Sequence, residues 1–444
     1  MNKFVTTNYC DIMRILKQEI YFPIIIGIHF IIWAVDLSMY NGGFMEVSSD
    51  TLFFGELTNE SWLNIHRILG EVLSSWVVTV FAANFLMATR AKWVEKLFGG
   101  LDKMYLIHRR SGIIAVILLI AHFCVVPRDL TAFTVGKPLG FYALILILIG
   151  VFLSAAPPMK KKIPYHKWIN FHKLMGVFYV MAVIHGFMVK SLIQELPMTR
   201  AYVFGMAFIG ISAWFYRAFL FKTFNKSLDY SVNSVSDLGH GITEIEMRSK
   251  GQSLSFSAGQ FAFFRFDSLN KREQHPFTIS SHPDEESLRI TVKNLGDYTS
   301  QMNEINVGDN VSVEGPYGLF STRFAKEKDQ IWIAGGIGIT PFLSLIIDVY
   351  PNKTQLIWCV NTQDEAVYAS ELESLASQKD NCEFSVWSTS ENGYLSIEDL
   401  NLENPNSKAY YICGPKALKD SIIPQLLAIG VKRKDIYDEE FSFR

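Results

Sequence analysis

The chain has 444 residues, a length that suits roughly two to four domains. Its formal net charge of -2 argues against a nucleic-acid-binding protein, because such proteins present a strongly basic face. The five cysteines form no CxxC or CxxCH motif, which excludes zinc ribbons, disulfide frameworks and covalently attached haem as first interpretations.

Apolar runs of membrane-spanning length recur along the first half of the chain and cease near Phe221. They predict six transmembrane helices, at roughly 20–38, 66–88, 108–126, 138–156, 170–190 and 201–221. At the N-terminus, the acidic residues Asp11 and Glu19 lie in the segment before the first apolar run, and no small-residue cleavage site follows that run. We therefore expect the first span to be retained rather than removed as a signal peptide.

Basic side chains concentrate in two connections between the predicted spans. They are Arg90, Lys92, Lys96 and Lys103 in 89–107, and Lys160, Lys161, Lys162 and Lys167 in 157–169. The positive-inside rule places such connections in the cytoplasm. We therefore expect a multi-pass protein of the cell membrane, embedded in the lipid bilayer, with both termini and everything after the last span in the cytoplasm.

From about Lys222 the composition becomes that of a soluble protein. Short β-rich segments separated by Gly, Asn and Asp turns, such as FAFFRF and LRITVK, predict an antiparallel β-barrel over 223–325. Over 326–444, segments such as QIWIAGG and TQLIWCV alternate with helical patterns and predict a doubly wound parallel sheet. The expected fold is therefore a six-span α-helical membrane domain (1–222), then a β-barrel, then an α/β domain.

Four histidines lie within the predicted spans: His108 and His122 in the third span, and His172 and His185 in the fifth. Both spans start from cytoplasmic connections and run parallel, so His108 and His172 lie near the cytoplasm and the other two lie deeper. At ~1.5 Å per residue the two levels are ~20 Å apart, which fits two haems stacked within a ~30 Å bilayer core. Neutral imidazole ligates haem iron, and ionisable residues inside membranes are usually functional.

The rotation of these two helices is less regular. At about 3.6 residues per turn, a separation of 14 positions returns nearly to the same helix face, but the 13 positions in the fifth span do not. The fifth span should therefore bend, unwind locally or use different rotamers, with Gly176 as a candidate position. The alternative for each histidine is a hydrogen bond to a neighbouring helix.

Other polar residues of the first half lack this pairing. We expect His29 and His66 at the membrane interface or the outer side, and His166 in a loop. Arg67 and Arg90, at opposite ends of the second span, could pair with haem propionates or serve as interfacial anchors.

Three motifs in the predicted barrel, HPFTISS, VKNLGDYT and VEGPYG, together indicate a flavin site. A flavin ring needs an aromatic or hydroxyl neighbour, here Phe277 and Thr278, and its pyrophosphate needs backbone N–H groups and hydroxyls. The candidate FAD contacts are His275, Pro276, Phe277, Thr278, Ser280, Lys293, Gly296, Asp297, Thr299, Gly315 and Gly318. Singly, each motif is also typical of a polar strand end.

The stretch WIAGGIGITPFLSLI predicts a phosphate loop between a strand and a helix. Gly335, Gly336 and Gly338 permit close backbone approach, and the helix that starts at Thr340 and Pro341 favours a dinucleotide phosphate at its N-terminus. The spacing is not GxGxxG, so this is a different phosphate loop. A tight strand–helix turn without a ligand is the alternative.

Two later stretches complete the candidate site. YICGP ends a strand at the sheet edge where cofactors bind, which puts Cys413, Gly414 and Pro415 near a nicotinamide ring, although a buried thiol explains Cys413 equally well. In the final EEFSFR, Phe441 or Phe443 could stack on the flavin or pack at the sheet edge. The catalytic candidates are Phe441, Cys413 and Thr278.

Together these residues resemble the NADPH oxidase and ferric reductase superfamily, most closely its short prokaryotic members. The resemblance covers nearly the whole chain, through HRRSG…AH and FHKLMGV…VIH, then HPFT, GDYT, EGPYG, AGGIGITPF and CGP in that order. It implies two b-type haems, FAD on the barrel and NADPH or NADH on the last domain. It also implies that His108 and His172 ligate the inner haem, that His122 and His185 ligate the outer haem, and that Phe441 covers the flavin.

One feature departs from relatives that favour NADPH, which often carry a basic residue after the second strand of the nucleotide domain. Here that position holds Asn361, and Tyr394 stands where some relatives have arginine. The hypothesis is that NADH is accepted as well as or better than NADPH, which steady-state rates with each nucleotide would test. The chain contains no EF-hand loop of the D-x-[DN]-x-[DN]-G type, so we expect neither calcium control nor an obligatory protein activator.

The sequence therefore predicts a transmembrane oxidoreductase that passes electrons from cytoplasmic NAD(P)H through FAD and two haems to an outside acceptor. Oxygen, giving superoxide, is the first expected acceptor, and ferric chelates or a periplasmic protein are the alternatives. The rival classes are a haem-binding sensor module and a flavin reductase with a merely structural anchor. Reduced b-type absorption bands that appear on adding NADH would exclude both rivals.

Overall fold

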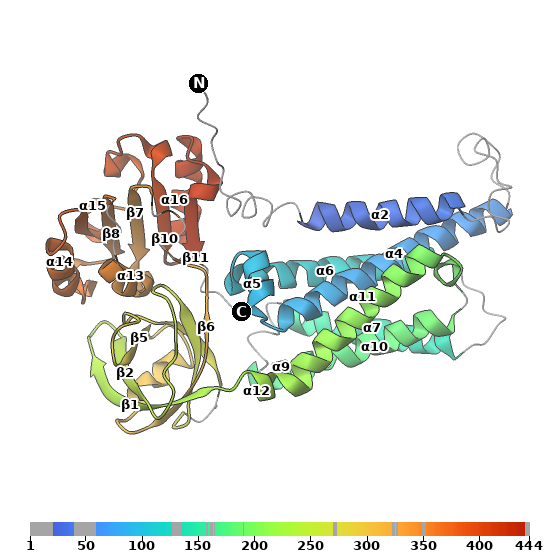
Figure 1. The fold of residues 1–444 in the computed structure, drawn as a ribbon, viewed down its shortest axis with the longest axis horizontal. Coiled ribbons are helices and arrows are strands. Elements are labelled where there is room, and N and C mark those ends of the chain that lie inside the picture. The colour runs from blue at the N-terminus through green and yellow to red at the C-terminus, as the bar shows by residue number, and fades with distance from the viewer. Residues whose placement is uncertain are drawn as a thin grey trace. The chain divides into compact units, whose positions relative to one another are not determined.

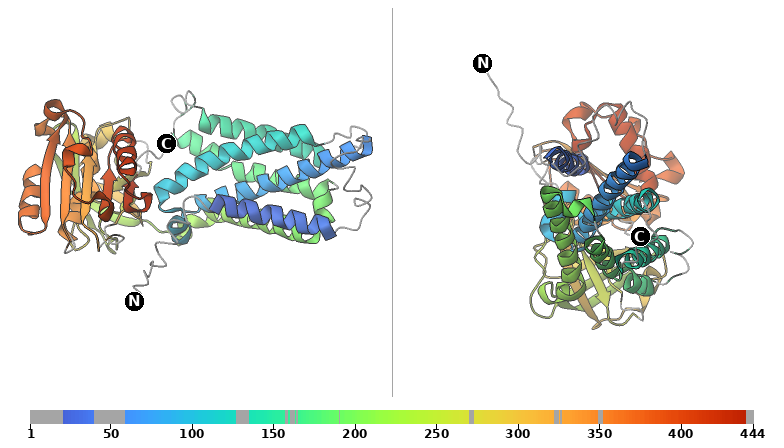
Figure 2. Two further views of the ribbon diagram at one scale, coloured as in Figure 1. Left: turned by 90° about the horizontal axis from the view of Figure 1, so that it is seen from above. Right: turned by 90° about the vertical axis from the view of Figure 1, so that its right-hand side faces the viewer.

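The computed structural model describes residues 21–39, 59–126, 135–156, 165–189, 191–269, 273–321, 327–348 and 352–439, with the single residues 159, 163 and 325. The chain divides into two compact units, a helical one that ends at Phe224 and a second that holds the residues from Asn225 onward together with the short segment Lys96–Lys103. Figure 1 and Figure 2 show long helices running side by side in the first unit and two sheets in the second.

The helical unit is built from the apolar stretches of the first half. Its helices are α2 (Tyr21–Met39), α4 (Asn59–Ala88), α5 (Lys92–Phe98), α6 (Leu101–Val125), α7 (Gly136–Ala155), α9 (Tyr165–His172), α10 (Met175–Met188), α11 (Pro197–Phe215) and α12 (Phe221–Phe224). A short 3₁₀ turn, Leu192–Gln194, precedes α11, and a π-helical turn, Tyr216–Leu220, joins α11 to α12.

Within the described residues, five helical stretches are long and apolar enough to cross a membrane. They are Ile65–Ala88, Leu101–Val125, Gly136–Ala155, Lys167–Met188 and Pro197–Phe224. These match the second to sixth predicted spans, so a multi-helix membrane domain is confirmed. The first predicted span coincides with α2, whose apolar part, Gly27–Met39, is shorter than the other five. The predicted count of six is therefore not confirmed.

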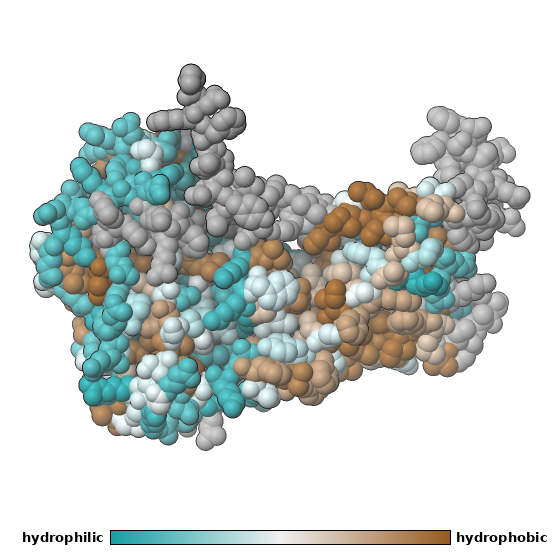
Figure 3. Space-filling view, in the orientation of Figure 1, coloured by the Kyte–Doolittle hydropathy of each residue, from teal (hydrophilic) through white to brown (hydrophobic). Residues whose placement is uncertain are grey.

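Large apolar side chains cover the outward faces of these helices. Ile117 is 60% exposed and Phe208 is 73% exposed, and Figure 3 shows such residues as brown surfaces along the helical unit. A continuous apolar surface of this kind is stable in hydrocarbon and unfavourable in water. Between the helices, Trp76, Phe81 and Tyr179 belong to a buried core.

Two predicted connections contain helix. Residues 89–107 include α5 and the first two turns of α6, which begins at Leu101 rather than at 108. Asp102 in the first turn complements the helix N-terminus, and backbone hydrogen bonds continue where hydropathy falls. The expectation that His166 lies in a loop is wrong, because residue 166 belongs to α9.

The second unit begins with an antiparallel sheet. Its strands are β1 (Leu228–Asp237), β2 (Ile242–Ser249), β3 (Phe261–Phe266), β4 (His275–Thr278), β5 (Leu288–Lys293) and β6 (Asn310–Tyr317), in the order β4-β3-β6-β1-β2-β5. A bridge between Ile279 and Ile290 links the two edges of the sheet, so the predicted barrel is confirmed. The side chains of Ile245, Phe264 and Val313 fill its interior.

A five-stranded parallel sheet follows. Its strands are β7 (Gln330–Gly335), β8 (Thr354–Val360), β9 (Cys382–Ser388), β10 (Ala409–Cys413) and β11 (Ile436–Glu439), in the order β11-β10-β7-β8-β9. Its helices are α13 (Thr340–Leu345), α14 (Ala369–Ser377), α15 (Thr389–Asn392) and α16 (Lys416–Ala428). Along β7, Trp332 and Ile333 belong to cores on opposite faces, which is why the strand is apolar throughout. The predicted α/β domain is confirmed.

Candidate functional site

The fifth span is interrupted between its two histidines. Helix α9 ends at His172 and α10 begins at Met175. The N–H of Leu174 donates to the carbonyl of Phe171 (2.9 Å), three residues back instead of four. A 3₁₀-type turn has 3.0 residues per turn and so rotates the chain further per residue than an α-helix does. The helix is therefore irregular between the two histidines, but the chain is wound more tightly there rather than unwound.

Trp214 of α11 stabilises this interruption. Its indole Nε1 donates to the carbonyl of Lys173 (3.0 Å), so a carbonyl at the break has a hydrogen-bond partner. A Cβ atom at Gly176 would lie 2.1 Å from the Trp214 indole. Gly176 thus matters as expected, because only glycine admits the indole that satisfies the break.

The third-span histidines both contact α4. Nδ1 of His108 lies 3.2 Å from the carbonyl oxygen of Asn84, and Nδ1 of His122 lies 2.7 Å from that of Gly70. The two carbonyls are 14 positions apart, as are the two histidines, so α4 offers a matched partner at each level. A carbonyl only accepts, so Nδ1 carries the proton in both rings and Nε2 keeps its lone pair.

The fifth-span histidines both contact α7. Nδ1 of His185 lies 2.8 Å from the carbonyl oxygen of Gly136, and Nδ1 of His172 lies 3.2 Å from the hydroxyl oxygen of Ser154. That hydroxyl donates to the carbonyl of Gly150 (2.7 Å), so its oxygen accepts from His172. Gly136 and Ser154 are 18 positions apart, about five α-helical turns, and so share one face of α7.

All four rings therefore direct Nε2 away from their hydrogen-bond partner, and in a neutral ring this nitrogen carries a lone pair. This is the arrangement of metal-binding histidines, in which the second ring nitrogen donates to a fixed oxygen. The ring centroids of His108 and His172 are 6.1 Å apart. Two imidazoles that bind one metal ion, each at about 2.0 Å, have centroids roughly 6 Å apart. The donor set thus fits haem iron with two axial histidines.

Glycines permit two close approaches between helices near His122 and His185. A Cβ atom at Gly140 would lie 2.5 Å from Nδ1 of His185, and one at Gly70 would lie 2.3 Å from Cγ2 of Val126, next to the end of α6. Sequence analysis missed both positions. The available signal was a glycine within an apolar helix, which usually marks a close approach of another chain segment.

His29, which we expect at the membrane interface or the outer side, is packed between helices. It is 1% exposed, its Nε2 lies 3.0 Å from the hydroxyl of Ser75, and its ring packs against Trp76 at a centroid distance of 4.8 Å. The hydrogen bond to Ser75 and the packing against Trp76, both from α4, lower the free-energy cost of burying this imidazole among the helices.

The other polar residues singled out in the helical unit, His66, Arg67 and Arg90, also have partners within the protein. Nδ1 of His66 lies 3.2 Å from the carbonyl of Val125. Arg67 forms an ion pair with Glu71 (3.2 Å). Arg90 donates to the hydroxyl of Tyr105 (2.7 Å). Both arginines thus have protein partners, and both alternatives, interfacial anchoring and pairing with haem propionates, stay open.

The barrel holds a buried hydroxyl among the candidate flavin contacts. Thr278 at the end of β4 is buried, and in the described part of the chain its Oγ1 has no hydrogen-bond partner. Such an atom costs free energy unless a ligand or water satisfies it. Phe277 precedes it, and His275 stacks on Tyr298 with ring centroids 3.6 Å apart. An orphaned hydroxyl beside aromatic rings fits a bound flavin.

The GDYT and EGPYG motifs form tight turns. Oγ1 of Thr299 accepts from the N–H groups of Leu295 (2.9 Å) and Gly296 (3.0 Å), so this hydroxyl holds its own loop. Gly318 has φ +95°, a conformation that favours glycine. Gly315 lies against Ala262, with only 2.9 Å between its would-be Cβ and that of Ala262. Asp297 lies in the same turn as Gly296.

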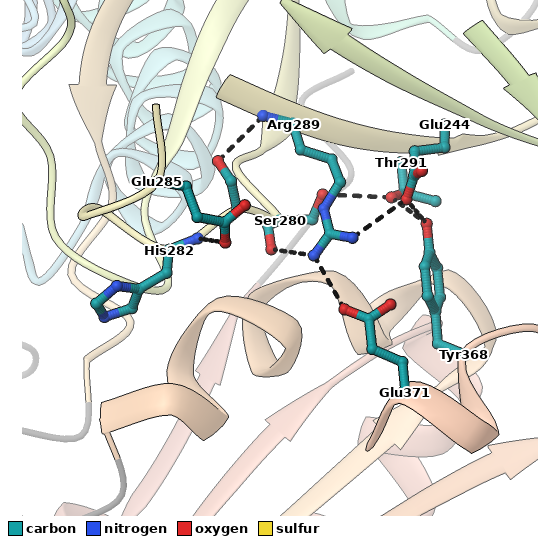
Figure 4. A network of polar contacts seen from close by, with 9 residues as sticks. Glu244, Ser280, His282, Glu285, Arg289, Thr291, Tyr368 and Glu371 are labelled. Carbon is teal, nitrogen blue, oxygen red and sulfur yellow. Dashed lines mark hydrogen bonds and ion pairs between the residues drawn. The ribbon is translucent and has the colours of Figure 1, made fainter. Parts of the chain in front are cut away.

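Two predicted cofactor contacts also have partners within the protein. Ser280 and Lys293 face the contact between the barrel and the α/β domain, where Lys293 pairs with Glu365 (3.3 Å). Oγ of Ser280 lies 3.3 Å from Oγ1 of Thr291 and its carbonyl accepts from Arg289 (Figure 4). These side chains join the two domains, and nothing in their described contacts reserves them for FAD.

Arg289 is the centre of that contact, which sequence analysis missed (Figure 4). Its guanidinium lies 3.2 Å from Glu371 of α14 and 3.4 Å from Glu244 of β2, and the hydroxyl of Tyr368 donates to Glu244 (2.6 Å). Burial opposes the charge on Arg289, but Glu371 and Glu244 outweigh it and raise the pKa of the guanidinium. The domains are thus joined by a partly buried cluster of ion pairs and hydrogen bonds.

The two glycine-containing motifs of the α/β domain meet at the carboxyl ends of β7 and β10. Ala334 pairs with Cys413 across these strands. A Cβ atom at Gly338 would lie 2.3 Å from the carbonyl oxygen of Cys413, and one at Gly414 would lie 3.0 Å from the backbone of Gly335. Glycines here let two loops touch backbone to backbone at the edge where nucleotides bind in such sheets.

Residues that follow this contact begin α13. The hydroxyl of Thr340 donates to the carbonyl of Ile337 (3.1 Å), and Pro341 lies in the first turn, where its missing N–H is not needed. Gly336 has φ +52°. Pro415 contacts the loop through Gly335, with 2.9 Å between its Cδ and a Cβ at that glycine. The predicted phosphate loop therefore has the expected backbone shape.

Cys413 is fully buried, which is compatible with both interpretations, a structural thiol and a side chain near the nicotinamide ring. Burial raises its pKa well above the ordinary value, and the carboxylate of Glu439 adds to the shift. It is therefore neither a thiolate nucleophile nor a base. Phe441 and Phe443 lie outside the described residues. Glu439 is buried at the end of β11 and lies near Gly318 of the barrel. It is a further candidate residue of the cofactor site, and the sequence motifs did not predict it.

Comparisons with known proteins agree with this architecture. Residues 73–183 match the family "Ferric reductase like transmembrane component", 227–321 match "FAD-binding domain" and 332–422 match "Oxidoreductase NAD-binding domain". Dual oxidase 1 of Homo sapiens is 26% identical over 249 residues, which are 52% of this chain and 15% of that protein. Respiratory burst oxidase homolog protein A of Arabidopsis thaliana is 23% identical over 227 residues, 45% of this chain and 25% of that protein.

The chain belongs to the NADPH oxidase and ferric reductase superfamily. This superfamily member spans only 15% to 25% of the length of these curated relatives. Among solved structures, flavohemoglobin from Malassezia yamatoensis covers 87% of this chain and 100% of its own, with 14% identity and a TM-score of 0.50. A ferredoxin NADP+ reductase from Neisseria gonorrhoeae covers 49% of this chain and 99% of its own, with 20% identity and a TM-score of 0.42.

Proposed function

We propose that this superfamily member is a membrane NAD(P)H oxidoreductase that moves electrons from cytoplasmic NAD(P)H, by way of FAD and two b-type haems, to an acceptor across the membrane. The observation that carries the proposal is that four intramembrane histidines, two at each level, all keep Nε2 available as a ligand. When bound, FAD accepts a hydride and releases electrons singly, and each haem iron carries one electron.

The histidines hold the haems. His108 and His172 bind the iron on the cytoplasmic side, and His122 and His185 bind the outer one. Their Nδ1 partners fix each ring before the metal arrives, so little ordering is needed on binding. Buried apolar residues such as Trp76, Phe81 and Tyr179 form the core of the same helical unit.

The soluble unit binds the other two cofactors. The Thr278 hydroxyl contacts the flavin ring, which also satisfies its orphaned oxygen, and Phe277 packs beside it. The backbone of Gly335 and Gly338 receives the nucleotide pyrophosphate at the start of α13. Phe441 covers the flavin until the nicotinamide docks. The basic connections of the helical unit support a cytoplasmic location for this unit.

Oxygen is the proposed acceptor: the two electrons of one NAD(P)H convert two O2 to two superoxide, with release of NAD(P)+ and one proton. The oxidases among the relatives support this choice. A ferric chelate is the alternative, supported by the family description that residues 73–183 match. Superoxide-dismutase-sensitive cytochrome c reduction, compared with ferric-chelate reduction by the same purified protein, decides between them.

The proposal predicts two haems b and one FAD per chain, with both haems reduced by NADH. The measurement is haem and flavin content of purified protein, followed by anaerobic absorption spectra before and after NADH. Reduced b-type bands in the full expected amount are the expected result. A preparation that holds only yellow flavin, or haem that NADH leaves oxidised, would refute the proposal.

We also expect NADH to be used at least as well as NADPH. Neither 361–368 after β8 nor 389–398 after β9 contains lysine or arginine, and Asp364 and Glu365 lie in the first of these segments. A 2′-phosphate would meet no cation there, whereas a ribose hydroxyl needs none. Steady-state kcat/KM with each nucleotide tests this. A strong preference for NADPH would contradict it.

A further inference from the structure

One of the four histidines is held differently from the others. His108, His122 and His185 donate Nδ1–H to backbone carbonyls, which no substitution removes. The partner of His172 is a side chain, the hydroxyl of Ser154 (3.2 Å).

The position of His172 in the chain explains why it needs a side-chain partner. It is the last residue of α9, directly before the interruption of the fifth span, whereas the other three lie inside α6 or α10. Backbone geometry at a helix end is less constrained than inside a helix. A ring at this position therefore needs an additional contact to keep one orientation.

Ser154 and Trp168 supply that contact together. The indole of Trp168 stacks on His172 with ring centroids 5.1 Å apart and planes 22° apart. Its Nε1 donates to the hydroxyl of Ser154 (3.1 Å), which also donates to the carbonyl of Gly150 (2.7 Å). The hydroxyl of Ser154 thus uses its one proton and both acceptor positions.

A shared hydroxyl oxygen is a weak acceptor for His172. Its second lone pair already accepts from Trp168, whereas a backbone carbonyl is a stronger dipole. The Nδ1–oxygen distance of His172 is 3.2 Å, which is longer than the 2.7 Å of His122 and the 2.8 Å of His185 and equal to that of His108 with the Asn84 carbonyl. A stronger hydrogen bond at Nδ1 makes an imidazole a more electron-rich ligand, which stabilises ferric iron.

We propose that Ser154, braced by Trp168, is a positioning residue that orients His172 and sets the reduction potential of the inner haem independently of the outer haem. This inference rests on the proposed function, because it assumes that His172 binds haem iron. Ser154 and Trp168 would then be a residue pair through which the reduction potential of one haem changes without a change of its iron ligands.

The first test is Ser154→Ala in the full-length, haem-loaded protein. Loss of the hydrogen-bond acceptor makes the His172 ring donate less electron density to the iron. The midpoint potential of one haem should therefore rise by ~59 mV, which is a tenfold change in its one-electron reduction equilibrium, and the other midpoint should not change. The measurements are an anaerobic spectroelectrochemical titration, the electron paramagnetic resonance spectrum of the ferric haems, and the haem content.

Three further variants separate tuning from structural damage. Ser154→Thr keeps a hydroxyl and should restore the wild-type midpoint. Trp168→Phe keeps an aromatic ring but frees the Ser154 oxygen to accept more strongly from His172, so the same midpoint should fall. Ser74→Ala is the matched control, because Ser74 also donates to its own helix (Glu71 carbonyl, 2.8 Å) but contacts no proposed ligand. It should leave both midpoints unchanged.

The outcomes distinguish this inference from the proposed function. Selective loss of one haem in Ser154→Ala, with both haems kept in Ser154→Thr, also supports the inference. Unchanged midpoints and resonance spectrum in a fully loaded Ser154→Ala protein overturn it, as do equal effects of the alanine and threonine variants. A wild-type protein without haem instead overturns the proposed function.

Discussion

Replacement of His122 by alanine is expected to remove the outer haem and to lower NADH-driven reduction of the outside acceptor by at least ~100-fold. Replacing a residue that only supports a metal ligand typically costs about 10- to 100-fold, and loss of the ligand itself should cost more. Reduction of the flavin by NADH should not change, because His122 lies in α6, in the other unit from the barrel. The measurements are haem content, stopped-flow flavin reduction and acceptor reduction in sealed vesicles.

His66→Ala is the matched control for this experiment. His66 also directs Nδ1 to a carbonyl at the end of α6, that of Val125, at 3.2 Å. It is not a proposed ligand, so its variant should keep two haems and most of the activity. Undiminished acceptor reduction in His122→Ala would show that electrons do not pass through this histidine pair.

Gly338→Ala is expected to slow reduction of the flavin by NADH by about 10- to 100-fold. The added Cβ would lie 2.3 Å from the carbonyl oxygen of Cys413 and 2.6 Å from its carbonyl carbon. Because these are backbone atoms of β10, an interior strand of the sheet, they cannot shift easily, and the loop that contains Gly338 must move. Such overpacking typically lowers the free energy of unfolding by about 1–3 kcal/mol. The movement displaces the backbone that we propose to hold the pyrophosphate.

Stopped-flow flavin reduction over a range of NADH concentrations measures this effect, which should appear mainly in KM. Chemical reduction of the haems by dithionite should be normal, since the helical unit is unaltered. Gly251→Ala is the control, because a Cβ there would meet no atom within 4 Å. Wild-type kinetics in Gly338→Ala would mean that the nucleotide does not use this loop.

Much of the fold follows from local patterns. The segments FAFFRF, LRITVK and TQLIWCV coincide with β3, β5 and β8, because alternating or continuous apolar residues bounded by turns leave few other structures. The spans were found from their apolar length alone. Helix ends were less predictable: the polar start of α6 and all of α5 were expected as loop, since hydropathy does not report backbone hydrogen bonds.

The candidate site divides in the same way. The positions of His108, His122, His172 and His185, and the need for irregular winding in the fifth span, were visible in the spacing. The contact around Arg289 was not, because its partners Glu244 and Glu371 come from different domains. The contacts of Ser280 with Thr291 and of Lys293 with Glu365 were not predicted either, since a strand-end motif does not show which neighbour it faces.

The sequence by itself thus determined which residues can serve as ligands, at which two depths, and which soluble motifs accompany them. Only the tertiary structure decided that each imidazole carries its proton on Nδ1 and offers Nε2. The four oxygens responsible lie 24, 52, 18 and 49 positions away from their histidines, on other helices. Hydropathy and spacing are properties of single segments, whereas a hydrogen bond between helices exists only after they pack.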